Sequence, residues 1–163
     1  MNYQKLFTMQ KGLDKHIETK HGLLEEDLFE RKVLALLVEL GELANESRCF
    51  KFWSLKSSSP KQIVLEEYVD GVHFILSLGI ECGFEHELDY TAIVKNKAAL
   101  TEQFLFVFEL IHKFRASKSL VDYRQLFQAY IHLGELLGFH SGDMEKAYMD
   151  KNEVNYERQK QGY

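Results

Sequence analysis

The sequence has little that would build a disulfide framework, a zinc site or a membrane span. Its two cysteines, Cys49 and Cys82, form no C-x-x-C pair and no cluster with histidine, so neither a disulfide-rich scaffold nor a zinc finger is indicated. No apolar run approaches the ~20 residues that cross a membrane, and residues 1–16 lack the apolar region of a signal peptide. We therefore expect reduced thiols, a cytoplasmic location and no membrane partner.

An excess of basic residues is absent as well. The 163 residues include 20 Lys and Arg against 25 Asp and Glu, which gives a net charge of −5. This balance excludes nucleic acid as the main partner, because binding to a phosphate backbone requires a basic face. An acidic protein still binds a nucleotide where metal ions bridge the two sets of negative charge.

Proline occurs only once, and strand-like alternation of apolar and polar residues is missing. Apolar residues instead recur at three- and four-residue spacings, which predicts one all-α domain over residues 1–163, folded as a bundle of about six helices. Ser59 is expected to cap the third helix, with Pro60 at its first position. The predicted helices cover residues 6–21, 25–52, 60–82, 100–114 and 123–137, with a connection at 83–90. A sixth helix is expected to begin at Ser141 or Asp143 and to carry Met144, Ala147, Tyr148 and Lys151.

Two short acidic motifs carry the clearest chemical signal. Glu39 and Glu42 lie in the apolar segment LALLVELGEL, and Glu67 and Asp70 precede the apolar segment VHFILSLGI. Carboxylates at i and i+3 share one helix face, so two packed helices point all four at a common spot. Converging carboxylates without Cys or His favour hard cations, Mg²⁺ or Mn²⁺, which are completed by water and substrate phosphates.

The alternative is a non-catalytic helical interaction module whose acidic faces are solvated. The apolar surroundings of both pairs argue against it, because buried carboxylates are costly unless a cation compensates them. The sequence therefore favours a metal-dependent enzyme that acts on a phosphorylated substrate.

Other residues are candidates for binding that substrate. His73 lies one turn after Asp70, where it would contact a ribose or orient a carboxylate, or serve only as hydrogen-bonded structure. Trp53, the single tryptophan, would stack on a base or belong to the core. On one face of the last helix the spacing places a phenol, an ammonium, an amide and a guanidinium, which together suit phosphate. These groups belong to Tyr148, Lys151, Asn155 and Arg158.

The spacing of the two acidic motifs, with 24 residues between Glu42 and Glu67, resembles that of the all-α nucleoside triphosphate pyrophosphohydrolases, which include MazG-like enzymes and the dimeric dUTPases. The match is closest to the dimeric dUTPases. It extends through residues 9–14 (MQKGLD), 67–74 (EYVDGVHF) and 147–159 (AYMDKNEVNYERQ), and so through most of the chain.

The resemblance implies Mg²⁺-dependent hydrolysis of dUTP, and also of dUDP, to dUMP in a homodimer. It implies that Gln10 lies near the uracil and that Trp53 helps to enclose the base. This chain has Asp14 where the family often has asparagine, and an ionised carboxylate only accepts hydrogen bonds, so Asp14 cannot read uracil O2 or O4 as an amide does. A house-cleaning or dCTP-directed enzyme of the same superfamily therefore stays open. The metal ligands that the resemblance implies are Glu39, Glu42, Glu67 and Asp70. Among these carboxylates we expect Glu39 also to accept the proton of the attacking water.

Overall fold

The computed structural model describes residues 1–87 and 99–162, and every regular element in these ranges is an α-helix. This confirms the predicted all-α fold. The predicted connection at 83–90 ends outside the described residues. The helices are α1 (Tyr3–His21), α2 (Phe29–Ser47), α3 (Lys61–Glu81), α4 (Leu100–Ser117), α5 (Leu120–Leu136) and α6 (Ser141–Lys160).

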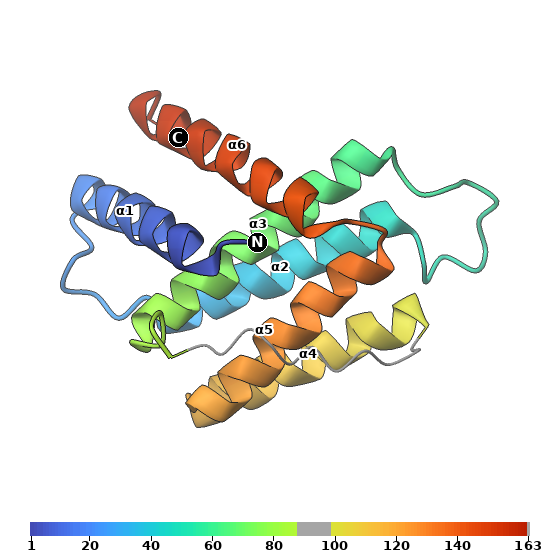
Figure 1. Ribbon diagram of the computed structural model, residues 1–163, viewed down its shortest axis with the longest axis horizontal. Helices are drawn as coiled ribbons and strands as arrows, with labels where there is room; N and C mark the ends of the chain where they lie inside the picture. Colours follow the sequence, from blue (N-terminus) through green and yellow to red (C-terminus); the bar gives the residue numbers. More distant parts are fainter. Residues whose placement is uncertain (88–98, 163) are drawn as a thin grey trace.

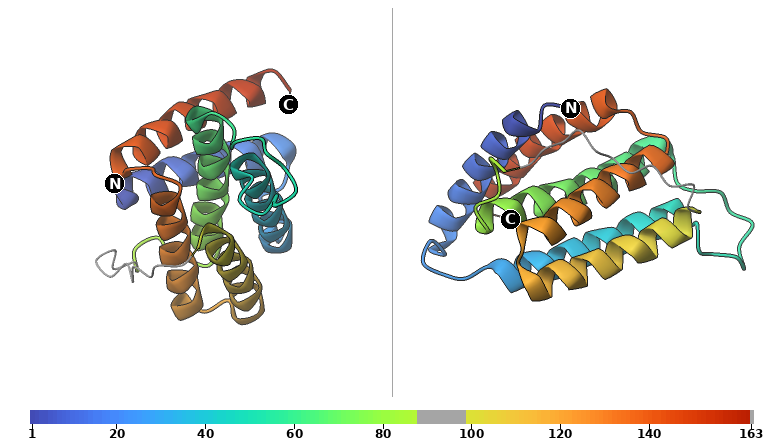
Figure 2. Two further views of the ribbon diagram at one scale, coloured as in Figure 1. Left: turned by 90° about the vertical axis from the view of Figure 1, so that its right-hand side faces the viewer. Right: turned by 60° about the horizontal axis from the view of Figure 1, so that its bottom comes forward.

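Helix α3 is the centre of the bundle and packs against α1, α2, α5 and α6, while α4 pairs with α5 (Figures 1 and 2). Its central position follows from its sequence, because buried residues occur at nearly every position from Val64 to Gly79. A helix that is apolar on almost all sides is stable only when neighbours cover almost all sides. Residues on α3 are therefore fixed relative to three of the helices that frame the site.

Two glycines bring α5 close to α3. A Cβ atom at Gly71 would lie 2.0 Å from the Tyr130 hydroxyl oxygen, which itself donates a hydrogen bond to the Tyr68 carbonyl at 2.9 Å. At Gly79 a Cβ atom would lie 2.2 Å from the hydroxyl oxygen of Tyr123. Because Gly71 directly follows Asp70, this tight packing holds the turn of α3 that carries one of the acidic motifs.

The boundaries of α2 and α3 differ from the prediction. Helix α2 ends at Ser47 and not at Phe52, because Arg48 adopts a left-handed conformation with φ of 58°. The predicted cap by Ser59 is wrong, since its hydroxyl donates to the Glu46 carboxylate and no side chain caps α3. Residues 48–60 consequently form a connection that projects from the bundle (Figure 1). Among the described residues, no helix has both the length and the apolar character needed to span a membrane.

Candidate functional site

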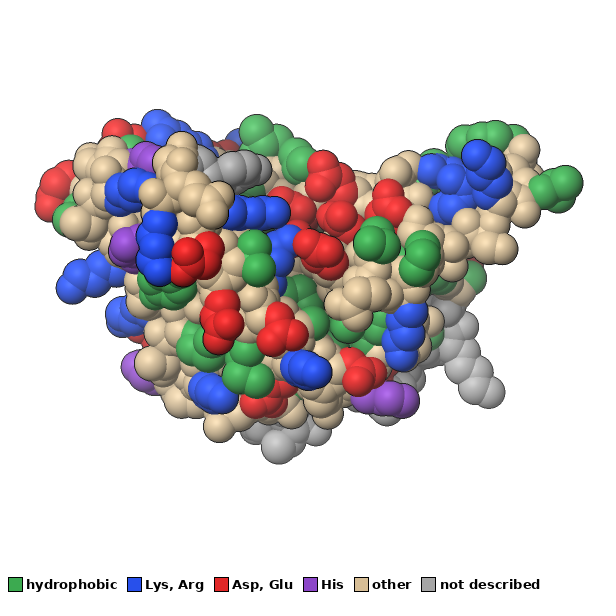
Figure 3. All heavy atoms as spheres, turned by 90° about the horizontal axis from the view of Figure 1, so that it is seen from above, with side chains coloured by type: hydrophobic (Ala, Val, Ile, Leu, Met, Phe, Trp, Pro, Cys, Tyr) green, Lys and Arg blue, Asp and Glu red, His purple; other side chains and the backbone are tan. Residues whose placement is uncertain are grey.

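Three of the four predicted metal ligands converge where α2 packs on α3. Glu39, Glu67 and Asp70 each place one ligand atom so that all three atoms lie within 4.8 Å of one another. Acidic side chains gather on the face that Figure 3 shows, beside the projecting connection. The structure thus brings together, from two helices, an oxygen-ligand set of the kind that Mg²⁺ prefers.

Glu42, the fourth predicted ligand, stands at the edge of this set. Its side chain is exposed and it is not one of the three converging carboxylates. It is close enough to act electrostatically, because its negative charge contributes to raising the pKa of both Glu39 and Glu67.

The electrostatics of the cluster favour a bound cation. Burial, followed by the negative charges of Asp70, Glu42 and Glu67, raises the pKa of Glu39 to about 7. Burial also raises the pKa of Glu67 and of Asp70. Burial and mutual repulsion oppose the ionisation of these carboxylates. A bound cation therefore stabilises their ionised form strongly.

Lys151 on α6 already supplies one positive charge to the cluster. Its buried ammonium lies 2.6 Å from Asp70 Oδ2 and 3.0 Å from Glu66 Oε1. Burial alone would lower its pKa, but the hydrogen bonds and charges of these two carboxylates outweigh burial and raise the pKa of Lys151. The ammonium is therefore a charged group held against the acidic cluster.

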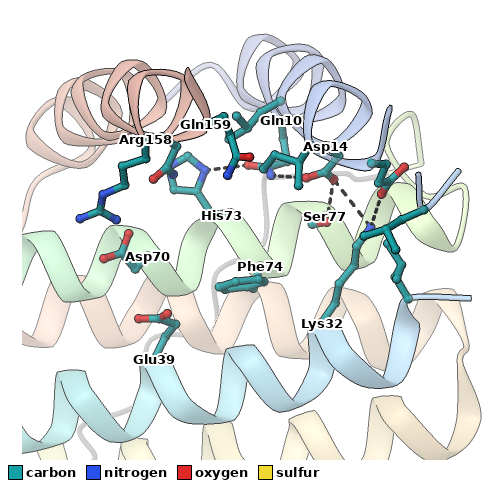
Figure 4. A pocket seen from close by; sticks show the side chains of 16 residues that line it. Gln10, Asp14, Lys32, Glu39, Asp70, His73, Phe74, Ser77, Arg158 and Gln159 are labelled. Atoms are coloured by element: carbon teal, nitrogen blue, oxygen red, sulfur yellow. Dashed lines mark hydrogen bonds and ion pairs between the residues drawn. The ribbon is translucent and has the colours of Figure 1, made fainter. Parts of the chain in front are cut away.

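A pocket of about 340 Å³ leads away from the cluster between α1, α2, α3 and α6. Glu39 and Asp70 line one end, beneath Arg158, and Asp14 and Lys32 line the other (Figure 4). The Phe74 side chain lies between the two ends. The remaining predicted residues that line the pocket are Gln10, His73 and Asn155.

One wall of this pocket is a rigid hydrogen-bond network. The Gln10 carbonyl accepts from the Tyr148 hydroxyl at 2.7 Å and from His73 Nδ1 at 2.7 Å, while its amide nitrogen donates to Asp14 Oδ1 at 2.7 Å. Burial lowers the pKa of His73 to about 3, so the ring is neutral. Since Nδ1 carries the proton, His73 Nε2 has a free lone pair, and this buried atom has no hydrogen-bond partner in the described residues.

Two predicted binding residues lie elsewhere. Trp53 is on the projecting connection, 66% exposed, where its ring contacts Phe50 and Phe52 and does not line the pocket. Tyr148 is fully buried, and it stacks on His73 at 4.2 Å. The structure gives Tyr148 the role of orienting Gln10 and does not place it on the pocket-lining side of α6 with Asn155 and Arg158.

The sequence analysis missed Lys32, Ser77 and Phe74. Ser77 donates to Asp14 Oδ2 at 2.6 Å, and Lys32 lies 4.0 Å from the same oxygen. The sequence could have indicated Ser77 as a pocket residue, because this polar residue interrupts the apolar segment VHFILSLGI. Lys32 precedes an apolar run on another helix, and nothing local connects it to Asp14.

A family model described as dUTPase matches residues 2–163, almost the entire chain. A search of curated proteins finds no match.

Proposed function

The chain belongs to this all-α dUTPase family and is a dUTP diphosphatase, and we propose that the whole chain forms one catalytic domain with the substrate in the pocket between α1, α2, α3 and α6. The observation that carries the proposal is the polarity of the pocket. Carboxylates suited to a metal–phosphate complex line one end, and hydrogen-bonding groups suited to a base line the other.

The family is generally metal-dependent, and we propose Mg²⁺, with Mn²⁺ as a substitute, as the ion held by this chain. Glu39, Glu67 and Asp70 fit such an ion because they offer converging hard oxygen ligands, and Glu42 adds its negative charge from the edge of the set. When bound, the metal neutralises the phosphate chain and lowers the pKa of a bound water.

Glu39 is the best candidate to accept the proton of the attacking water. Of the three converging carboxylates, only Glu39 and Asp70 line the pocket, and Asp70 is hydrogen-bonded to Lys151. Within residues 1–87 and 99–162 Glu39 has no such hydrogen-bond partner, so its carboxylate is available to a water in the pocket.

The α6 side chains complete the phosphate end. Arg158 and Asn155 line the pocket, and Lys151 lies next to Asp70. Asp70 is one of the residues that would hold the metal, and the Lys151 ammonium beside it would donate to the phosphates. The guanidinium of Arg158 would stabilise negative charge on the leaving phosphates and is not a base.

The nucleoside would occupy the remainder of the pocket. The Phe74 ring offers an apolar surface for the base or sugar, and Gln10 and Asp14 offer polar contacts beyond it. The free lone pair of His73 Nε2 would accept a hydrogen bond from a nucleoside donor, which satisfies an otherwise unpaired buried atom.

The family is usually oligomeric, and we propose a homodimer for this chain. Leu34 and Val38, one turn apart on α2, are 62% and 51% exposed, and Leu105 and Phe106 on the neighbouring α4 are 59% and 44% exposed. Exposed apolar residues on adjacent helices favour burial against a second copy. Light scattering should give a mass near twice 19.1 kDa, and Leu34→Glu should shift it towards one chain.

The experiment that tests the proposed site is Mg²⁺-dependent pyrophosphate release from dUTP, dCTP, dTTP and ITP. Wild-type protein should prefer dUTP, and Glu39→Gln should lose most of this activity. Glu109→Gln makes the same chemical change at an exposed position of α4 and should remain active. Equal activity of the two variants would place the chemistry outside this pocket.

A further inference from the structure

The end of the pocket away from the acidic cluster carries an aspartate between two donors. Asp14 Oδ1 accepts from Gln10 and Oδ2 accepts from Ser77, and the Lys32 ammonium lies 4.0 Å from Oδ2. Burial raises the pKa of Asp14, whereas Ser77, Lys32 and Gln10 lower it. Burial outweighs these groups, so the pKa of Asp14 lies above its ordinary value, and in the observed arrangement each of its two oxygens accepts a hydrogen bond.

Gln10 retains one unused N–H next to this carboxylate. Both lone pairs of its carbonyl are taken by Tyr148 and His73, which fixes which side of the amide faces Asp14. One hydrogen of the NH₂ group binds Asp14, and the second has no acceptor in the described part of the chain.

Lys32 likewise retains one unused N–H on the other side of Asp14. Its ammonium is 2.6 Å from Glu81 Oε2 and 3.1 Å from Glu18 Oε1, and these bonds use two of its three hydrogens. At 4.0 Å from Asp14 the third is beyond hydrogen-bonding distance, and it has no other acceptor in residues 1–87 and 99–162. Lys32, Asp14 and Gln10 therefore present a donor, an acceptor and a donor in a row (Figure 4).

Uracil presents the complementary pattern of acceptor, donor and acceptor at O2, N3–H and O4. We propose that Asp14 and Lys32 are the residues of this chain that select uracil, with the Asp14 carboxylate accepting N3–H and with Lys32 and Gln10 donating to the flanking carbonyls. The inference rests on the proposed function of the pocket as the dUTP site. It also explains why position 14 holds an aspartate, although an asparagine would be expected there to donate to a uracil carbonyl.

Cytosine would be rejected at two of the three positions. Its N3 is a lone pair that would face an acceptor oxygen of Asp14, and its N4 amino group would face a donor in place of O4. The acceptor oxygens of Asp14 therefore act against cytosine, whereas an amide at the same position could turn its NH₂ group towards the cytosine N3.

The test compares kcat/KM for dUTP and dCTP in wild type and Asp14→Asn. The ratio of dUTP to dCTP should fall at least about tenfold in Asp14→Asn, as expected when a base-discriminating hydrogen-bond pair is lost. Asp122→Asn is the matched control, because this buried aspartate on α5 also pairs with a lysine, Lys113, at 2.8 Å but lies outside the pocket lining. Its ratio should equal that of wild type.

A second measurement changes the substrate and not the protein. dUTP methylated at N3 lacks the donor that Asp14 accepts, so wild type should bind and cleave it at least about tenfold less well than dUTP. Asp14→Asn should discriminate less between the two. A folded Asp14→Asn variant that slows dUTP and dCTP equally, or a wild type that accepts the methylated substrate, would overturn the inference.

The outcomes separate this inference from the proposed function. If wild type hydrolyses dUTP and Glu39→Gln abolishes the reaction while Asp14→Asn keeps the wild-type ratio, only the uracil-reading role fails. If Glu39→Gln stays fully active, the proposed site itself fails.

Discussion

Replacing Glu39 by glutamine should abolish most of the stabilisation that Mg²⁺ gives to the wild-type protein. At a Mg²⁺ concentration of 100 times Kd, binding to the folded state contributes about 2.7 kcal/mol to the free energy of unfolding. For a domain of this size each kcal/mol raises the Tm by about 2–4 °C, so the shift should be about 5–11 °C. Glu39→Gln removes one of three converging ligands and should show little of this shift.

The same substitution should stabilise the protein when Mg²⁺ is absent. The pKa of Glu39 is raised from 4.5 to about 7 in the folded protein, so the stability linked to this group is present below pH 4.5 and is lost as the pH rises through 7. At pH 8 the ionised Glu39 is repelled by Asp70, Glu42 and Glu67, and glutamine relieves this repulsion. Glu39→Gln should therefore exceed the wild-type Tm by more at pH 8 than at pH 5.

The assay is thermal unfolding at pH 5 and pH 8, with and without Mg²⁺, for wild type, Glu39→Gln and Glu109→Gln. The exposed Glu109 controls for the general loss of one negative charge. A wild type without a Mg²⁺-dependent shift, or a Glu39→Gln variant with the full shift, would refute the assignment of the metal site.

Three further results are expected. The affinity of wild type for Mg²⁺, measured by calorimetry, should rise with pH up to about 7, by at most about tenfold per pH unit, because Glu39 must release its proton; the slope should flatten in Glu39→Gln. Gly71→Ala should lower the free energy of unfolding by about 1–3 kcal/mol in denaturant titrations, because the new Cβ meets the Tyr130 hydroxyl, whereas Gly41→Ala has free space and should not destabilise the fold. Arg158→Ala should weaken binding of a non-hydrolysable dUTP analogue by about 1.5–3 kcal/mol with little change in Tm, and unchanged binding would remove Arg158 from the phosphate site.

Much of the acidic cluster could be predicted from sequence because its geometry is local. Glu67 and Asp70 share a helix face through their spacing alone, and the apolar residues around Glu39 predict that α2 packs with this face inward. The apolar periodicity also predicted the six helices. It did not predict the end of α2, because an unfavourable left-handed conformation at Arg48 terminates a segment that remains apolar to Trp53.

The base end of the pocket was decided by tertiary structure. Asp14, Lys32 and Ser77 come from three helices, and Ser77 is 63 residues from its partner Asp14 in the sequence. The spacing on α6 predicted a shared face for Tyr148 and Lys151, but the packing of α6 on α1 and α3 turned the phenol into the core and the ammonium towards Asp70. Helical periodicity fixes which residues share a face of one helix, whereas the rotation and position of each helix against its neighbours depend on the packing of the whole core.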